Sequence, residues 1–542
     1  MFSDKNNILQ TVALLKEYGV KHIVISPGSR NAPLIQCFTQ EPFFNCQLVA
    51  DERNAAFFAL GIIQCTKQPA AVCCTSGSAL LNYAPAVVEA YYQQLPLIIV
   101  SADRPQEWIG QMDGQTMPQQ NVFAGYIQKS VHLPEVHDES GEWYCNRLIN
   151  EALITCYSDV PGPVHINVPI SEPLFHFTVE NLPEVRKIAY VKPAKTVDIK
   201  PFSKIWNQEA KKMLVIGQMP QNPELTEILE LLAETSGCII LSEHLANSHS
   251  EEFIHNFDRI LYKAKENEKQ DLSPDLLITL GGHIVSKRLK RFLRENKPKY
   301  HWHLSNNKEV ADLYMSLTDL IEAGEKKFLN QLANKSILSK ESNKYSNNWY
   351  HKSTQIMAPG DDSAEFSDLY VTGQLIKRLP DNSKLILANS LTVRNAQFFN
   401  LDSSISVYCN RGVNGLEGTL AGAIGFASVC KDPVYLIIGD LSFFYGLNAL
   451  WRIEHIKNLR ILLINNKGGG IFRSITGLDK MGDIHQFITV QHDTDVQKWI
   501  EATSVKYLQA KNRRQLSKNL DVLMNKRIET SMCLEVITDI KK

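Results

Sequence analysis

The 542-residue sequence predicts an α/β protein with three parallel-sheet domains that carry helices on both faces. Short apolar runs that end in Gly, Ser, Asp or Asn alternate with amphipathic segments, which is the pattern of buried parallel strands and their crossover helices. The length corresponds to about three or four domains. With 44% hydrophobic residues, 28 Gly and 23 Pro, the composition is that of a chain that folds throughout.

The first domain is expected at residues 1–182. Its strands are predicted at four apolar runs, residues 22–29, 70–78, 97–105 and 161–169. Two segments with helical spacing, residues 31–40 and 78–94, open near Asn or Ser, whose side-chain oxygens can cap exposed N–H groups. A polar stretch with Pro and Lys, residues 180–201, follows this domain.

A middle domain is expected at residues 200–345 and a C-terminal domain at residues 364–542. Strands of the middle domain are predicted at residues 213–220, 238–244, 275–282 and 299–305. Strands of the C-terminal domain are predicted at residues 384–390, 404–412, 434–440, 460–470 and 532–537. The polar stretch at residues 326–362 is interpreted as a helix that leads into a linker. The first and third segments share a strand-then-loop rhythm without a visible sequence repeat.

Charge and cysteine content exclude several classes of protein. The 57 Lys and Arg residues nearly balance the 58 Asp and Glu residues, so no overall field favours nucleic acid or an anionic membrane as a partner. The 11 Cys residues include no Cys-x-x-Cys pair, which argues against a disulfide framework or a zinc ribbon. No signal peptide or membrane-spanning run is visible. The sequence therefore predicts a cytoplasmic protein.

Two neighbouring apolar strands of the third segment end in polar pairs, Gly439-Asp440 and Asn465-Asn466. Parallel strands bring both ends to one carboxyl edge, where ligands of α/β sheets bind. A carboxylate, an amide oxygen and a backbone carbonyl at Gly468 are hard donors that suit Mg²⁺ shared with a diphosphate. Either pair alone is more often a simple turn after a strand. The combination with the glycine run at residues 468–470 favours a metal site.

These motifs resemble the signature of thiamine diphosphate enzymes, in which Gly-Asp-Gly precedes Asn-Asn by some twenty-odd residues. Here Asn466 follows Asp440 by 26 residues, and Leu441 replaces the second glycine. One branch, the synthases of 2-succinyl-5-enolpyruvyl-6-hydroxy-3-cyclohexene-1-carboxylate in menaquinone biosynthesis, commonly has Gly-Asp-Leu-Ser, as at residues 439–442. Further segments resemble this branch at residues 25–34, 51–61, 74–90, 101–105 and 286–289. The resemblance as a whole covers nearly the whole chain and is densest in its first and third segments.

The resemblance implies a pyruvate oxidase-like architecture. An N-terminal pyrimidine-binding domain, a middle domain and a C-terminal diphosphate-binding domain would together hold thiamine diphosphate with Mg²⁺ or Mn²⁺. The implied reaction decarboxylates 2-oxoglutarate and adds the succinyl carbanion in a 1,4 sense to isochorismate, with release of CO₂. Active sites at a subunit interface make a homodimer, or a dimer of dimers, the expected assembly. Four aromatic residues would suit that interface or the core of one chain: Phe57, Phe58, Tyr91 and Tyr92.

The resemblance also assigns roles to individual residues. Glu52 would donate a hydrogen bond to the cofactor's aminopyrimidine, so its carboxyl group must start protonated, which requires burial against apolar neighbours. By itself, the Asp-Glu-Arg triplet around Glu52 would be read as a solvated turn. The implied catalytic residues are Glu52, Ser29, Arg30 and Gln115. The implied cofactor contacts are Glu52, Ser390, Leu416, Gly439, Asp440, Leu441, Ser442 and Asn466, and the implied metal ligands are Asp440, Asn466 and Gly468.

Both substrates carry two carboxylates, for which guanidinium groups are the matching partners. The substrate contacts that the resemblance implies are Arg30, Arg104, Gln115, Lys287, Arg288, Arg394, Arg411, Ile471 and Phe472. Taken singly, each cation is more often a surface ion-pair residue. His301 and His303 share a strand face without a third ligand at metal spacing and are interpreted as structural.

Two alternatives stay open. The chain could be another thiamine diphosphate carboligase or 2-oxo acid decarboxylase, such as a relative of acetolactate synthase, although Leu441-Ser442 and the basic residues argue against it. It could also be a non-catalytic protein that keeps the fold and binds a nucleotide in the middle domain. Retention of Glu52, Asp440 and Asn466 together argues against that second alternative.

Overall fold

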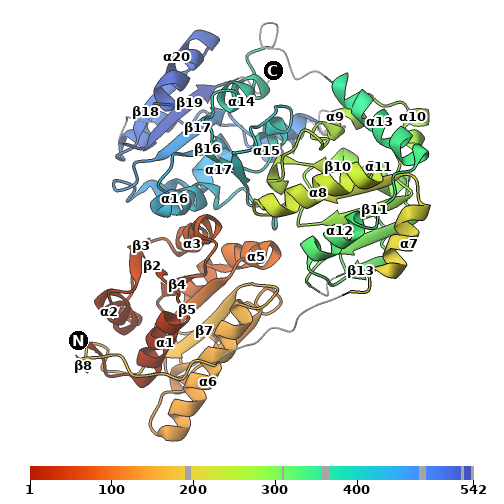
Figure 1. Ribbon diagram of the computed structural model, residues 1–542. Coiled ribbons are helices and arrows are strands. Elements are labelled where there is room, and N and C mark those ends of the chain that lie inside the picture. Colours follow the sequence, from red (N-terminus) through yellow and green to blue (C-terminus); the bar gives the residue numbers. More distant parts are fainter. Residues whose placement is uncertain (189–196, 308–309, 357–364, 475–483, 526–529, 539–542) are drawn as a thin grey trace.

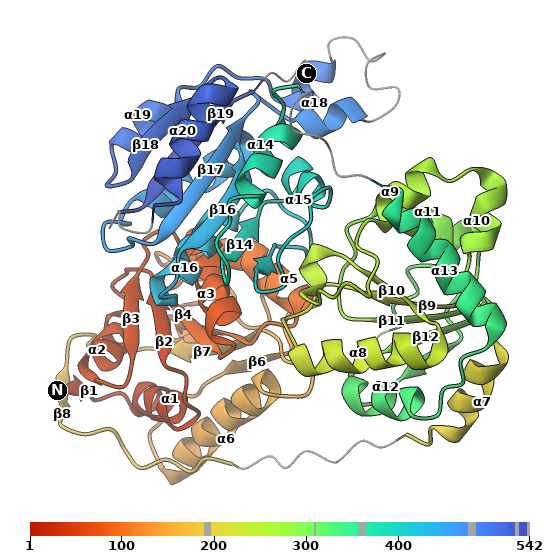
Figure 2. The ribbon, with the colours of Figure 1, turned by 45° about the horizontal axis from the view of Figure 1, so that its top comes forward.

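A computed structural model describes residues 1–188, 197–307, 310–356, 365–474, 484–525 and 530–538. It contains three parallel sheets with helices on both faces, so the predicted fold class is confirmed. The N-terminal and C-terminal sheets stack through a pair of helices, and the middle sheet lies beside them (Figures 1 and 2). Within the described residues, no helix is long and apolar enough to cross a membrane.

The N-terminal sheet has six strands in the order β3-β2-β4-β5-β7-β6. Helices α1, α2 and α6 pack on one face, and α3, α4 and α5 pack on the other. The strands are β1 (Phe2–Ser3), β2 (His22–Ile25), β3 (Asn45–Leu48), β4 (Ala70–Cys74), β5 (Leu97–Asp103), β6 (Lys129–His132), β7 (Val164–Pro169) and β8 (Phe177–Val179), of which β1 and β8 form a small separate pair. The helices are α1 (Asn6–Glu17), α2 (Ala32–Gln40), α3 (Glu52–Thr66), α4 (Ser78–Asn82), α5 (Ala84–Gln93) and α6 (Glu139–Cys156).

The middle sheet has five strands in the order β10-β9-β11-β12-β13. They are β9 (Lys212–Ile216), β10 (Ile239–Ser242), β11 (Leu276–Leu280), β12 (Tyr300–Leu304) and β13 (Asp319–Ile321). Helices α7 (Lys200–Gln208), α8 (Pro223–Ser236) and α12 (Glu325–Ala333) cover one face. Helices α9 (Phe257–Lys263), α10 (Glu266–Leu272), α11 (Lys287–Glu295) and α13 (Lys340–Thr354) cover the other.

The C-terminal sheet repeats the topology of the N-terminal sheet, with the order β15-β14-β16-β17-β19-β18. Its strands are β14 (Lys384–Leu387), β15 (Ser406–Tyr408), β16 (Val434–Gly439), β17 (Leu459–Asn465), β18 (Lys506–Ala510) and β19 (Met532–Ile537). Its helices are α14 (Asp368–Ile376), α15 (Leu391–Ala396), α16 (Thr419–Val429), α17 (Asp440–Tyr445), α18 (Ile484–Thr489), α19 (Val496–Glu501) and α20 (Arg513–Leu523). The shared rhythm of the first and third segments therefore reflects a shared strand order.

The contact between α3 and α16 joins the N-terminal and C-terminal domains (Figure 1). The helices approach closely because glycines line the contact. A Cβ atom on Gly425 would lie 2.0 Å from the Phe58 carbonyl oxygen, and one on Gly61 would lie 2.0 Å from the Gly422 carbonyl oxygen. Phe57 and Phe58 are buried in one continuous apolar core that spans both domains. These two aromatics therefore serve the core of one chain.

Two predicted helices are each split in two. Residues 78–94 form α4 and α5, because Pro85 has no N–H to donate to the preceding turn. The polar stretch at residues 326–362 contains α12 and α13 instead of one helix, since the Ser339 side chain accepts a hydrogen bond from the Ser342 N–H and starts a new helix. Residues 357–362 of this stretch lie outside the described part of the chain.

Candidate active site

A cavity of about 190 Å³ lies at the carboxyl edge of the C-terminal sheet. It opens where β14, β16 and β17 end, which is where parallel α/β sheets bind ligands. The predicted residues that line it are Ser390, Leu416, Gly439, Asp440, Leu441, Ser442, Asn466, Gly468, Ile471 and Phe472. The structure therefore brings these predicted residues around one space, whereas Arg394 and Arg411 lie outside its lining.

Three oxygen donors at this cavity fit a hard cation. Asp440 is buried, and its carboxylate accepts a hydrogen bond from the Gly468 N–H at 2.9 Å. The side chain of Asn466 is anchored through its Nδ2, which donates to Asp368 at 2.7 Å, while its Oδ1 is buried with no hydrogen-bond partner. The Gly468 carbonyl accepts one hydrogen bond from the Gly470 N–H and keeps a second lone pair.

Within the described residues, no cluster of three His, Cys, Asp or Glu side chains could hold a metal ion. A metal here would depend on one carboxylate, one amide oxygen and one backbone carbonyl, which is a set that Mg²⁺ accepts together with phosphate oxygens and water. The orphaned Oδ1 of Asn466 is the observation that favours such a ligand, because a buried polar atom without a partner costs free energy.

Leu416 and Ser390 are held at the mouth of the cavity by backbone contacts. The Ser442 hydroxyl donates to the Leu416 carbonyl, which fixes the loop that carries the leucine. Ser390 has φ +74° and ψ −128°, a conformation that a residue with a side chain rarely adopts and that is concentrated at functional sites. The Arg394 side chain donates to the Ser390 carbonyl and so links this loop to a neighbouring cluster of cations.

That cation cluster consists of Arg394, Arg411 and Lys290. Arg411 is buried and donates to Asn389 at 2.9 Å, while its Nε has no partner. Burial lowers the pKa of Arg394, and the nearby charge of Arg411 lowers it further. Burial and Arg411 likewise lower the pKa of Lys290. Since like charges gather here with an unused guanidinium N–H, the cluster fits an anionic ligand.

A second group of cations lies at the carboxyl edge of the N-terminal sheet. Arg30 is buried, donates to the Ile170 carbonyl at 2.8 Å and pairs with Glu172 at 3.0 Å. Burial lowers the pKa of Arg30, and the neighbouring Arg104 lowers it further. Arg104 pairs with Asp113 at 3.4 Å, and its Nε is buried without a partner. Ser29, beside Arg30, is exposed.

Gln115 reaches this edge through a loop that packs on Gly77. Gly77 has φ +83°, and a Cβ atom there would lie 3.3 Å from the Gln115 backbone. The loop is anchored by buried Gln119, which accepts a hydrogen bond from the Gly77 N–H at 2.8 Å. The Gln115 side chain is exposed in the single chain.

Glu52 is the first residue of α3, after Asp51, whose side chain caps the helix by accepting from the Asn54 N–H. Its carboxylate accepts a hydrogen bond from Asn82 at 3.1 Å and is half-buried in the single chain. It does not line the Asp440 cavity of the same chain. The flanking Arg53 does reach that domain and donates to the Tyr445 carbonyl at 2.8 Å.

Lys287 and Arg288 lie at the exposed start of α11. Arg288 forms an ion pair with Asp258 and lies over the ring of Tyr262. Neither residue lines the Asp440 cavity, whereas Lys290, three residues further along the helix, faces Arg411.

Sequence reasoning missed several residues that the structure places at the site. Asn389 orients Arg411, Asp368 holds Asn466, and His492 contacts Asp440 at 3.2 Å. Lys290 follows Lys287 at helical spacing, a signal that could have included it in the basic set. Asp368 and His492 lie too far away in sequence for any spacing rule to connect them with Asp440.

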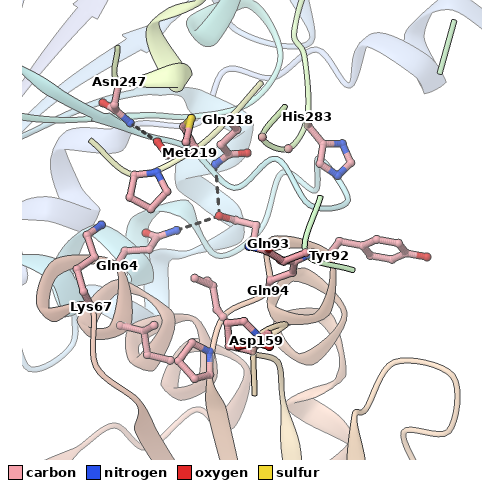
Figure 3. Close-up of a pocket in the computed structure, with 18 of the residues that line it drawn as sticks. Gln64, Lys67, Tyr92, Gln93, Gln94, Asp159, Gln218, Met219, Asn247 and His283 are labelled. Carbon is pink, nitrogen blue, oxygen red and sulfur yellow. Dashed lines mark hydrogen bonds between the residues drawn. The ribbon is translucent and has the colours of Figure 1, made fainter. Parts of the chain in front are cut away.

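A larger cavity, of about 720 Å³, lies elsewhere. It separates the carboxyl edge of the middle sheet from the C-terminal ends of α3 and α5 (Figure 3). Gln93 occupies its wall, where it accepts hydrogen bonds from Gln64 at 3.4 Å and Gln218 at 3.3 Å. The side chains of Lys67, Tyr92 and Asn247 also face this space in Figure 3.

Comparison with known families gives a consistent result for the three parts of the chain. The model described as "Thiamine pyrophosphate enzyme, N-terminal TPP binding domain" matches residues 10–127. The model "Middle domain of thiamine pyrophosphate" matches residues 185–387. The model "Thiamine pyrophosphate enzyme, C-terminal TPP binding domain" matches residues 390–536. Thiamine pyrophosphate is the same compound as thiamine diphosphate.

Curated relatives match over the full length. A 2-succinyl-5-enolpyruvyl-6-hydroxy-3-cyclohexene-1-carboxylate synthase of Bacteroides thetaiotaomicron is 45% identical over 100% of this chain and 97% of its own. A protein of the same name from Flavobacterium johnsoniae is 38% identical over 96% of this chain and 94% of its own. The crystal structure of benzoylformate decarboxylase from Polynucleobacter necessarius superposes with a TM-score of 0.74 over 99% of each chain, and its 17% identity supports the fold alone. The predicted resemblance is therefore confirmed, and the chain belongs to the 2-succinyl-5-enolpyruvyl-6-hydroxy-3-cyclohexene-1-carboxylate synthase family of thiamine pyrophosphate enzymes.

Proposed function

We propose that this chain is a thiamine diphosphate-dependent synthase of menaquinone biosynthesis. It decarboxylates 2-oxoglutarate and adds the resulting succinyl unit to isochorismate, with release of CO₂. One observation carries the proposal: the oxygen donors of Asp440 and Asn466 lie at the same sheet edge as the buried guanidinium of Arg411. An edge built in this way can hold a metal-bound diphosphate and a substrate carboxylate side by side.

The cavity at Asp440 would hold the diphosphate and its metal. Asp440, Asn466 and the Gly468 carbonyl are the proposed ligands of Mg²⁺ or Mn²⁺, and Ser390 and Ser442 lie beside them on the cavity wall. Leu416, Ile471 and Phe472 supply the apolar part of that wall. When bound, thiamine diphosphate supplies the electron sink that a decarboxylation of a 2-oxo acid needs.

The proposed substrate contacts are the two groups of cations. Arg394 and Arg411 lie beside the Asp440 cavity, whereas Arg30 and Arg104 lie at the N-terminal sheet edge with Gln115. The unused Nε groups of Arg411 and Arg104 can each donate to a carboxylate without breaking an existing hydrogen bond. Lys287 and Arg288 would join them from the exposed start of α11.

Glu52 is proposed to hold a proton against the aminopyrimidine of the cofactor bound by a second copy of the chain. Two observations support a homodimer: Glu52 is absent from the lining of its own chain's Asp440 cavity, and it is only half-buried. Exposed aromatic side chains, such as Trp108, Trp451 and Tyr92, offer apolar surface for that association. The eleven cysteines are all free, which fits the proposed cytoplasmic location.

The test is CO₂ release from labelled 2-oxoglutarate by purified protein with thiamine diphosphate and Mg²⁺. We expect release that rises strongly when isochorismate is added, together with loss of isochorismate absorbance. Release that isochorismate does not change would contradict the proposed acceptor. Pyruvate in place of 2-oxoglutarate is the control, and a faster reaction with pyruvate would indicate a different carboligase.

A further inference from the structure

Two carboxylates to which the sequence analysis assigned no role are buried beside the cation cluster. Glu89, on α5 of the N-terminal domain, is 1% exposed, and Glu243, after β10 of the middle domain, is 3% exposed. Neither lines the Asp440 cavity. The two carboxyl groups belong to different domains, and the positive charge of Arg411 lowers the pKa of both. A buried carboxylate is costly unless hydrogen bonds and opposite charges compensate it, so the partners of each are informative.

Glu243 holds the loop that leads into α11. One carboxylate oxygen accepts from the Val285 N–H at 2.7 Å, and the other accepts from the Ser286 N–H at 2.7 Å. Ser286 in turn caps α11, because its hydroxyl accepts from the Leu289 N–H at 3.0 Å. The next residues of this helix are Lys287 and Arg288, so Glu243 fixes the base from which two proposed substrate contacts project.

Glu89 holds the loop that follows Arg411. Its two oxygens accept from the Gly412 N–H and the Val413 N–H, each at 2.8 Å. The fit is tight, since a Cβ atom on Gly412 would lie 2.9 Å from the Glu89 carbonyl oxygen and 3.0 Å from its carboxylate. The same loop continues to Leu416 at the cavity mouth, so Glu89 sets the path of the backbone on both sides of Arg411 and Leu416.

Glu89 is itself held at a junction of the three domains. The Gln93 side chain donates to its carboxylate at 2.5 Å, and the side-chain Oε1 of Gln93 accepts from Gln218 of the middle domain (Figure 3). Gln218 also donates to the Cys409 carbonyl of the C-terminal domain at 2.9 Å. The Arg411 loop is thus anchored to the N-terminal domain directly and to the middle domain through Gln218.

The negative charges of Glu89 and Glu243 offset the positive charges of the cation cluster. Arg411, Arg394 and Lys290 gather in a partly buried space, and uncompensated like charges there would repel one another. Glu243 lies close enough to all three to offset their repulsion, and Glu89 does the same for Arg411. Burial raises the pKa of both carboxyl groups, to about 7 for Glu243, while the N–H donors and the cations counteract this rise.

We propose that Glu89 and Glu243 are positioning residues that clamp the Arg411 loop and the Lys287 loop, and thereby orient the cations that bind the substrate carboxylates. This inference rests on the proposed function for its substrates and on the backbone contacts for its geometry. Each carboxylate is expected to act through the loop that it holds, since neither lines the Asp440 cavity.

The test compares Glu89→Gln and Glu243→Gln with two matched controls. Each glutamine keeps the shape but replaces one acceptor oxygen with a donor. We expect KM for 2-oxoglutarate or isochorismate to rise about tenfold to a hundredfold, the effect of losing one charge-assisted hydrogen bond, with kcat changed much less and thiamine diphosphate affinity unchanged. The controls are Glu41→Gln and Glu209→Gln, which alter largely buried, lysine-paired carboxylates of the same two domains and should leave KM unchanged.

A double-mutant cycle tests whether Glu89 acts through Arg411. Once Arg411→Lys has removed the oriented guanidinium, Glu89→Gln should cost less than it costs in the wild-type background. Effects that simply multiply would overturn the proposed route. If either glutamine variant fails to fold, Glu89→Asp and Glu243→Asp keep the charge and shorten the reach, and the same rise in KM is expected.

Amide hydrogen exchange separates this inference from the proposed function. In the wild type, the amides of Val285, Ser286, Gly412 and Val413 should exchange slowly, and in the matching glutamine variants they should exchange faster. Unchanged exchange in the variants would overturn the clamps. Absence of turnover in the wild type would overturn the proposed function, and the exchange rates would still decide whether the carboxylates hold these loops.

Discussion

The N-terminal and C-terminal domains share one strand order, but their carboxyl edges carry different chemistry. The end of β17 presents Asn466, whereas the end of the corresponding strand β5 presents Arg104. The C-terminal edge encloses a cavity with an orphaned amide oxygen and a buried carboxylate. The N-terminal edge carries two neighbouring positive charges, Arg30 and Arg104, and it has Glu52 at the start of α3.

This difference teaches that the fold supplies the position of a site and the side chains supply its function. Parallel strands expose their carboxyl ends in both domains, so either edge could accept a ligand. The C-terminal edge gathers Asp440, Asn466 and the Gly468 carbonyl around one cavity, whereas the N-terminal edge carries Glu52 at the start of α3, outside the lining of that cavity. The proposed site uses both edges, so substitutions can test each edge separately.

The largest expected effect comes from the N-terminal edge. Glu52→Gln should lower kcat by about 10²- to 10⁴-fold, the usual contribution of a positioned acid or base, because glutamine cannot exchange a proton with the cofactor. Thiamine diphosphate should still bind with nearly unchanged affinity, since the diphosphate end is intact. The measurements are steady-state turnover and a cofactor titration followed by intrinsic fluorescence.

The matched control is Glu139→Gln. Glu139 is the first residue of α6, as Glu52 is the first residue of α3, and it is exposed in the same domain. It should retain wild-type turnover. Near-normal turnover of Glu52→Gln at saturating cofactor would show that the N-terminal edge does not provide the acid.

Substitution at the C-terminal edge should weaken cofactor binding, whereas substitution of Glu52 should lower kcat. Asp440→Ala removes the only carboxylate among the proposed metal ligands and should weaken thiamine diphosphate binding by at least about a hundredfold, since even indirect partners of a metal contribute about 10- to 100-fold. Treatment of the wild type with EDTA should have the same effect, and Mg²⁺ should reverse it. Isothermal titration calorimetry measures both.

Asp493→Ala is the control for Asp440. Asp493 is highly exposed and pairs with Lys467 near the same edge. Its loss should leave cofactor affinity unchanged. A fully active Asp440→Ala protein with ordinary cofactor affinity would contradict the assignment of the metal to this edge.

The sequence predicted the C-terminal edge better than the rest of the site. Asp440 and Asn466 each follow a buried strand directly, so local patterning was sufficient to bring them together. Glu89 could not be predicted in this way, because its partner Gly412 lies 323 residues away in another domain. Glu243 could not be predicted either, because its partner Val285 lies 42 residues away and depends on how the middle domain folds. Lys290 was missed because it follows the motif at residues 286–289, although its helical spacing from Lys287 was a usable signal.

The helices that join the two domains provide a smaller, purely structural test. Gly425→Ala would place a Cβ atom 2.0 Å from the Phe58 carbonyl oxygen, so it should destabilise the protein by about 1–3 kcal/mol through overpacking. Gly422→Ala, on the same helix, meets only the Phe57 carbonyl at an ordinary 3.6 Å and should be neutral or stabilising. Urea unfolding distinguishes the two, and equal stabilities would contradict the close contact of α3 with α16.

The smallest expected effect concerns the charge on Glu243, which faces Arg411, Lys290, Arg394 and Tyr314. Burial raises the pKa of Glu243 from 4.5 to about 7, although the Val285 and Ser286 amides and the cations oppose the rise. The folded protein therefore binds this proton more tightly than the unfolded chain does, and the contribution of Glu243 to the free energy of unfolding must fall as pH rises from 4.5 to 7. The Glu243→Gln variant has no carboxyl group to titrate at this position. Its free energy of unfolding, minus that of the wild type, should therefore rise between pH 4.5 and 7 and stay constant above pH 7. Urea unfolding at several pH values measures the difference, and parallel curves throughout would show that the buried carboxyl group is charged over the whole range.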